Sequence, residues 1–242
     1  TANAHAVAVG TTPKFTDAQI AEFRAKGGTN WQDEIFRTAP SQEYLLNLSG
    51  GSDKSSYFIS GNYQNQDGII NNSFYKRYTL RSNINSNLSD RVSTFLNITA
   101  SYSTAQNVDI PPDGPSSPLA QAITWAPTTP VYNADGSFVI SDPVGSISYN
   151  PVALTVNRLA VKDRMLANMI GGFKFRIIPG LTFNLQYGAN YLASDDKSFA
   201  GKITNNNTST TGIRSGKEIV LQNTNTLNYR KVFNKVHSLD LT

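Results

Sequence analysis

The feature that most constrains this chain is an alternation of apolar and polar side chains between Tyr44 and Tyr102. The stretch from Val92 to Tyr102, for example, places valine, threonine, leucine, isoleucine, alanine and tyrosine at every second position. Successive side chains of a β-strand point to opposite faces, so a period of two predicts strands with one apolar and one polar face. The sequence therefore predicts an all-β, antiparallel fold, and it leaves open whether the apolar face meets lipid or a second sheet.

The same period returns in the last third of the chain. Residues 165–177, 181–191 and 237–241 alternate clearly, whereas the stretch between Ile219 and Tyr229 is interrupted by Asn223 and Asn225. We expect four strands in residues 42–103 and four more in residues 162–242.

Composition excludes several classes of protein. Hydrophobic residues make up 39% of the chain, and no apolar run approaches the roughly 20 residues that a membrane helix needs. Spanning β-strands need only about 9–11 residues, half of them polar, so this does not exclude a membrane barrel. The net charge of +4 is spread along the chain and predicts no nucleic-acid site. The absence of cysteine excludes disulfides and cysteine metal sites.

The connections between the expected strands alternate in length. They are tight near residues 50–55, 87–91, 179–180 and 234–235, and long at residues 67–74, 103–161 and 194–217. Outer-membrane barrels have short periplasmic turns at one rim and long external loops at the other, which is the pattern seen here.

Charged residues follow the same division. Arg77, Arg81, Lys174 and Arg176 all fall on the polar face of their strands, so we expect them to line the lumen of a barrel. A lysine or arginine near the midplane of the lipid face costs about 2–4 kcal/mol. The exceptions, Lys76 and Lys231, lie at strand ends, where a long side chain can reach the interface. Tyrosine and phenylalanine also cluster at strand ends, as in an aromatic girdle.

The remaining segments are expected to be loops. Residues 1–41 form an extracellular loop with one short helix, which a capping box from Thr16 to Gln19 opens. Residues 104–161 form a long extracellular loop. The chain starts at Thr1 without a methionine and stops within an alternating run, so we expect it to be cut from a longer protein.

Three stretches carry a resemblance to a known family. They are NWQDEIFRTAP, YLLNLSGGSDKSSYFISGNYQNQDGII and YKRYTLRSNINSNLSDR, all between residues 30 and 91. In these motifs the chain resembles the SusC/RagA family of TonB-dependent outer-membrane transporters of Bacteroidota. The resemblance is close from Thr29 to about Tyr102. Beyond that it depends on the repeated pattern of alternating strands and on the stretch GGFKFRIIPGLTF.

This resemblance implies a fold, a location and partners. Family members look like outer-membrane barrels of about 22 strands with a plugged lumen, of which this chain would supply about eight. They work with a SusD-like surface lipoprotein, and the TonB complex drives their import of glycans or peptides. The plug and the TonB-contacting segment are expected to lie outside this chain, and residues 31–37 resemble family scaffold.

Aromatic residues of the long loop are the candidate substrate contacts. Trp125, Tyr132 and Tyr149 could stack on a sugar ring or a peptide, and packing onto the barrel rim or onto the partner is an equally good interpretation. Trp31 is interpreted as a packing anchor.

Nothing in the sequence predicts catalysis, a cofactor or a metal site. His5 and His237 have no carboxylate or nucleophile motif nearby, and Asp109 and Asp113 lie in a proline-rich stretch typical of a rigid loop. The run from Asn133 to Gly136 lacks the later glutamate of a calcium loop and is better interpreted as a hairpin turn.

Two functions remain open on this basis. The first is a barrel segment of a TonB-dependent importer in the bacterial outer membrane, with the polar face lining the lumen. The alternative is a soluble β-sandwich that binds glycan or acts as an adhesion module of a surface protein, with its apolar faces packed together.

Overall fold

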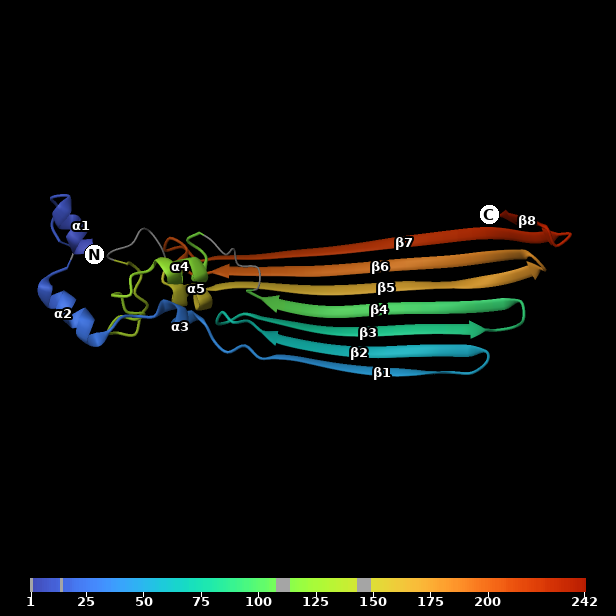
Figure 1. Ribbon diagram of the computed structural model, residues 1–242, viewed down its shortest axis with the longest axis horizontal. Coiled ribbons are helices and arrows are strands. Elements are labelled where there is room, and N and C mark those ends of the chain that lie inside the picture. The colour runs from blue at the N-terminus through green and yellow to red at the C-terminus, as the bar shows by residue number, and fades with distance from the viewer. Residues whose placement is uncertain (1, 14, 108–113, 143–148) are drawn as a thin grey trace.

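The computed structural model describes residues 2–13, 15–107, 114–142 and 149–242. Its main feature is one antiparallel sheet of eight strands in sequence order, β1 to β8 (Figure 1). The strands are β1 Ser41–Gly51, β2 Ser55–Asp67, β3 Phe74–Asn87, β4 Val92–Gln106, β5 Arg158–Ile178, β6 Leu181–Ala200, β7 Thr210–Phe233 and β8 His237–Leu241. The helices are α1 Ala2–Ala8, α2 Asp17–Lys26, α3 Trp31–Ile35, α4 Pro118–Thr124 and α5 Pro151–Asn157, with a 3₁₀ turn at Lys202–Thr204.

The predicted all-β antiparallel sheet is confirmed, and the sheet is open. Strand β1 pairs on one side only, with β2, and β8 pairs only with the end of β7. The predicted helix after Thr16 is also confirmed, because the Thr16 side chain accepts from the Gln19 amide and the Gln19 side chain accepts from the Thr16 amide. Among the described residues, no helix is both long and apolar enough to cross a membrane.

The predicted long connection at residues 194–217 is wrong. Strands β6 and β7 stay paired through this stretch, from Ala193 opposite Lys217 to Ala200 opposite Thr210, and only residues 201–209 connect them. The stretch is polar on both faces, so it lacks the apolar alternation that identified the other strands, but backbone pairing does not require that alternation. For the same reason β7 runs unbroken through Asn223 and Asn225.

The pairing register assigns every strand residue to one of two faces. The apolar face carries a row of four directly paired tyrosines, Tyr44, Tyr63, Tyr78 and Tyr102, which continues through Met165 of β5. The ring centroids of the first three are 6.2 and 4.9 Å apart. In the described part of the chain no second sheet covers this face, and side chains such as Leu80 and Leu221 are 52% and 76% exposed.

The short turns recede steadily from this row. The number of residues between the row and the short turn that ends the first strand of each hairpin grows along the sheet. It rises from seven in β1 (Tyr44 to Gly51) to sixteen in β7 (Lys217 to Phe233). The stagger is about 1.5 residues per strand. With a rise of about 3.3 Å per residue and a spacing of about 4.8 Å between strands, turns that lie in one plane require a strand tilt of about 45°.

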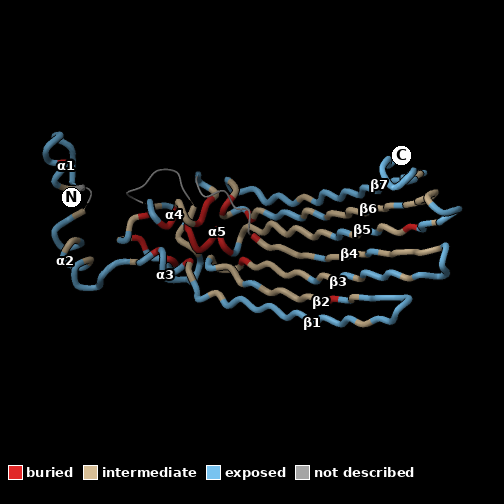
Figure 2. The backbone as a smooth tube through the Cα atoms, turned by 45° about the vertical axis from the view of Figure 1, so that its right-hand side comes forward, coloured by how far each residue is buried: buried red, intermediate tan, exposed pale blue. Residues whose placement is uncertain are grey.

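The buried core lies outside the sheet, in a small cap at the ends of the strands (Figure 2). The cap packs α3 against α4 and α5, and so joins segments almost a hundred residues apart in the sequence. Its buried cluster consists of Trp31, Ile35, Ala122, Trp125, Val131 and Val152. Trp31 and Trp125 meet edge to face with centroids 5.1 Å apart, and the Trp31 Nε1–H donates to the Ala126 carbonyl at 3.1 Å. The prediction of Trp31 as a packing anchor is confirmed.

Buried amides fasten the cap to the sheet. Asn107, which is 6% exposed, donates from Nδ2 to the Asn72 and Arg158 carbonyls, and its Oδ1 accepts from the Ala160 amide at 2.8 Å. Asn72 in turn donates to the Thr155 carbonyl of α5 at 3.0 Å. Both asparagines have a positive φ, 51° and 62°, which asparagine tolerates better than most residues.

We expect Asn107→Ala to weaken this junction by about 1–3 kcal/mol, because it leaves buried backbone groups without partners. Hydrogen exchange of the amides of residues 149–160 in the full-length protein should accelerate accordingly. Asn234→Ala is a matched control, since Asn234 also has a positive φ, 52°, and lies in the turn before β8. Unchanged exchange of these amides in Asn107→Ala would mean that the side-chain bonds of Asn107 do not hold the cap to the sheet.

Candidate functional site

The polar face of the sheet is a wall that consists mainly of amides and hydroxyls, which are interrupted by exposed apolar side chains such as Leu45, Leu166 and Val220. One row of directly paired residues runs from Ser60 through Arg81, Thr99 and Asn168 to Asn190. Asn168 donates to Asn190 across the strands. Such a wall offers both hydrogen-bond donors and acceptors to a hydrated solute.

Near β1 to β3 this wall is hollowed into a depression of about 270 Å³. It is lined by Glu43, Leu45, Ser60, Asn62, Gln64, Arg77, Thr79 and Arg81. The Glu43 carboxylate accepts from the Asn62 amide at 2.7 Å. The depression therefore holds one engaged carboxylate and two guanidinium groups.

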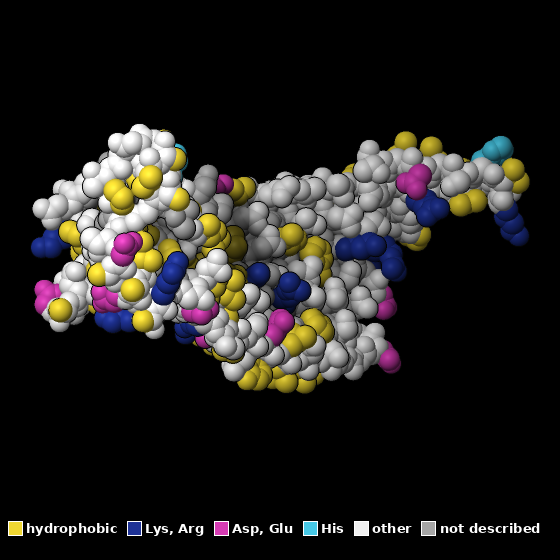
Figure 3. Space-filling view, turned by 60° about the vertical axis from the view of Figure 1, so that its left-hand side comes forward, with side chains coloured by type: hydrophobic (Ala, Val, Ile, Leu, Met, Phe, Trp, Pro, Cys, Tyr) yellow, Lys and Arg dark blue, Asp and Glu magenta, His cyan; other side chains and the backbone are white. Residues whose placement is uncertain are grey.

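The structure places all four predicted lumen-facing cations on this polar face. Arg77 and Arg81 belong to β3, and Lys174 and Arg176 belong to β5. Their paired residues are polar, such as Gln64 for Arg77 and Asn184 for Lys174. Basic side chains along the sheet surface are visible in Figure 3.

The three loop aromatics predicted as substrate contacts differ in their surroundings. Trp125 is only 3% exposed and belongs to the core of the cap, which supports the packing interpretation for this residue. Tyr132 is 49% exposed and lies against Phe138, with ring centroids 5.0 Å apart. Tyr149 is half-buried, and its hydroxyl bonds to Asn206 Oδ1 at 2.8 Å. Only Tyr132 presents a largely open ring.

The hairpin predicted at residues 133–136 is confirmed. The Gly136 amide donates to the Asn133 carbonyl at 3.0 Å, and Tyr132 bridges to Phe138. The Ser137 hydroxyl and amide donate to the Asp135 carboxylate, and these bonds lower its pKa from the ordinary value. Asp135 is thus a turn residue. In the described ranges no three His, Asp or Glu side chains gather as metal ligands, and Asp109 and Asp113 lie outside those ranges.

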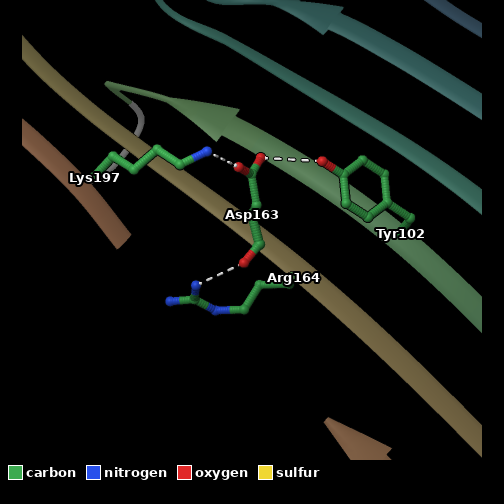
Figure 4. A network of polar contacts seen from close by, with 4 residues as sticks. All are labelled: Tyr102, Asp163, Arg164 and Lys197. Carbon is green, nitrogen blue, oxygen red and sulfur yellow. Dashed lines mark hydrogen bonds and ion pairs between the residues drawn. The ribbon is translucent and has the colours of Figure 1, made fainter. Parts of the chain in front are cut away.

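On the side of the tyrosine row that is farther from the short turns, the apolar face of β4 to β6 carries charged residues (Figure 4). Asp163 Oδ2 lies 2.9 Å from Lys197 Nζ, and the Tyr102 hydroxyl donates to Asp163 Oδ1 at 3.3 Å. On the other face, Arg164 pairs with Asp196 at 2.7 Å. Here both faces of the sheet are polar.

The sequence pattern reveals neither this charged network nor the Asn72–Asn107 junction. The network lies in a stretch assigned partly to loops, and no periodicity distinguishes a strand that is polar on both faces. Asn107 follows directly after β4, and asparagine at a strand end is a signal for positive φ, although it does not identify the partner.

We expect Trp125→Ala to destabilise the cap by about 3–5 kcal/mol, because it removes a buried aromatic side chain. Limited proteolysis of the full-length protein should then cut residues 114–157 much faster than in the wild type. Tyr132→Ala, at the exposed ring, should leave proteolysis unchanged. If the Trp125→Ala variant resisted proteolysis as well as the wild type does, Trp125 would not contribute to the packing of the cap.

The chain is similar in sequence to known TonB-dependent receptors. No family model matches the chain. TonB-dependent receptor P3 of Formosa agariphila is 36% identical over 166 residues, which cover 66% of this chain and 16% of that receptor. TonB-dependent receptor SusC of Bacteroides thetaiotaomicron is 26% identical over 187 residues, which cover 67% of this chain and 18% of SusC. The chain thus spans less than a fifth of the length of either relative.

The fold of this chain is also similar to that of solved structures. The RagAB peptide transporter superposes with a TM-score of 0.72 at 21% identity, over 88% of this chain and 25% of that chain. The RagAB peptide importer in its closed-closed state gives a TM-score of 0.71 over the same share of this chain. By sequence and by fold, the chain therefore corresponds to a stretch of a SusC/RagA-like TonB-dependent receptor.

Proposed function

We propose that this chain forms part of the wall of an outer-membrane barrel of about 22 strands that imports oligosaccharides or oligopeptides. The short turns would face the periplasm, and the cap and long loops would form the extracellular mouth. A SusD-like lipoprotein would close that mouth, and the TonB complex would supply energy through parts of the receptor outside this chain.

The single observation that carries this proposal is the distribution of charge on the apolar face. At a tilt of about 45°, each residue rises about 2.3 Å, so an apolar band about 25 Å tall corresponds to the ten or eleven residues nearest each short turn. In the described strands the charges of this face fall outside the band or at its margins. They are Asp67, Lys76, Asp163, Asp195, Lys197, Lys217 and Lys231.

Aromatic side chains mark both margins of the same band. The margin near the turns carries Tyr57, Phe175, Phe183 and Tyr229, and the opposite margin carries Tyr63, Tyr78, Tyr102 and Tyr191. Aromatic girdles at both interfaces are typical of membrane barrels. The uncharged polar side chains inside the band are hydroxyls and amides. The amides are Gln42 and Asn65 at its margin, which pair with each other in register, and Asn223 and Asn225, whose amides bond to each other at 2.6 Å.

The open edges of the sheet also support a larger barrel. Strand β1 and most of β7 each present an unpaired row of backbone groups, which lipid cannot satisfy. Further strands would pair with these edges and close the wall. The stagger of the turns is what a closed barrel of tilted strands requires.

The relatives suggest the transported class. The structural neighbour RagAB is a peptide transporter, and SusC and the Formosa receptor P3 are TonB-dependent receptors. Import would use the polar wall, because a hydrated oligomer can exchange hydrogen bonds with its amides and hydroxyls as it passes. The alternative of a soluble sandwich lacks support, since the described residues hold no second sheet to cover the apolar face.

Spin labels can test the placement in lipid. The chain has no cysteine, so labels at Leu80→Cys, Leu96→Cys and Leu185→Cys in the full-length protein, with any cysteine elsewhere removed, would report single positions of the apolar band. We expect relaxation by oxygen dissolved in the acyl chains and little relaxation by a water-soluble nickel complex.

Labels at Asn83→Cys, Thr99→Cys and Asn184→Cys, on the polar face of β3, β4 and β6, are the matched controls and should show the reverse preference. Immobilised labels shielded from oxygen at the three leucine positions would mean that protein covers this face. That result would contradict the proposal that the chain is part of an outer-membrane importer.

A further inference from the structure

Charge on the polar face is unequal within the height of the apolar band. The described strands place five basic residues there, Arg77, Arg81, Lys174, Arg176 and Arg230, against two acidic ones, Glu43 and Asp240. Both carboxylates are engaged, Glu43 with Asn62 at 2.7 Å and Asp240 with Arg230 at 3.8 Å.

The other four cations have no such partner. Among the described residues, none of these four side chains makes a hydrogen bond or an ion pair. Ser60 and Thr99 lie beside Arg81, and Glu43, which Asn62 engages, lines the same depression as the two arginines of β3. Guanidinium groups without an ion-pair partner favour an anion, and arginine is suited to carboxylates in particular.

The four cations also descend along the wall in order. Counted from the short turns after Asn87 and Ile178, Arg77 stands ten residues up, Arg81 six, Lys174 four and Arg176 two. At about 2.3 Å per residue, successive steps along the membrane normal are about 9, 5 and 5 Å. The cations thus span most of the band from the mouth towards the periplasmic rim.

We propose that these four side chains form a cationic track that selects oligomers bearing carboxylates as the transported class. The inference rests on the proposed function, because it requires that the polar face lines a lumen. Repeated carboxylates of an acidic oligosaccharide or an acidic peptide would pass from one cation to the next, each held weakly enough to leave. Rings and series of arginine and lysine select anions in pores by the same electrostatics.

Binding of charge-matched probes to the purified full-length receptor tests the track. The probes are oligogalacturonate and oligoglutamate, with neutral maltooligosaccharide and a serine-glycine peptide of equal lengths. Wild-type receptor should prefer the acidic member of at least one pair, and the preference should shrink as salt is raised. The pair that shows it distinguishes a sugar from a peptide source of the carboxylate.

The decisive variant is Arg77→Gln with Arg81→Gln. It should weaken binding of the preferred acidic probe about fivefold, as expected for the loss of two solvent-accessible charge contacts, and leave the neutral probe unchanged. The control is Lys76→Gln with Lys231→Gln, which removes the same charge from the opposite face and should change neither.

The outcomes separate the two proposals. Equal weakening of acidic and neutral probes, equal weakening by the control, or no charge preference in the wild type would each overturn the cationic track. The oxygen-accessibility measurement would be untouched by any of these results. Conversely, leucine labels shielded from lipid would overturn the barrel itself.

Discussion

The backbone pairing between neighbouring strands is the constraint on which the rest of the structure depends. Over seven strand pairs the register shifts only once, between Arg176 and Ile178 beside the β5–β6 turn, and it fixes which side chains share a face. Its regular stagger fixes how the strands tilt relative to the turns. Tilt in turn sets the height of every residue above the short turns. The positions of aromatic and charged side chains become interpretable only on that scale.

The distribution of buried side chains in this protein is the opposite of that in a soluble β-domain, where the sheet itself forms the core. The sheet leaves its Leu, Ile and Tyr side chains exposed, whereas the buried cluster lies in the cap, around Trp31 and Trp125 (Figure 2). A sheet that buries neither face gains little from water-driven packing, so strand pairing is its main source of stability within this chain. The proposed function assigns the cover of its apolar face to lipid. The cap, which stands beyond the strands, folds by ordinary apolar burial.

Charge follows the same geometry on both faces. On the apolar face, Asp163 and Lys197 lie beyond Tyr102, where the strands leave the proposed band, and pair with each other. On the polar face, Arg77 and Arg81 lie within the band and remain unpaired among the described residues. One alternation of side chains therefore separates a surface suited to lipid from a surface suited to a hydrated solute.

The sequence by itself determined the strands, their two faces and the tight turns, because a period of two and local turn chemistry are written in neighbouring residues. It also placed Arg77, Arg81, Lys174 and Arg176 on the polar face. Only the tertiary structure decided the stagger, the paired ends of β6 and β7, and the burial of Trp125 against Trp31. These features depend on contacts between residues far apart in the chain, which no local pattern encodes.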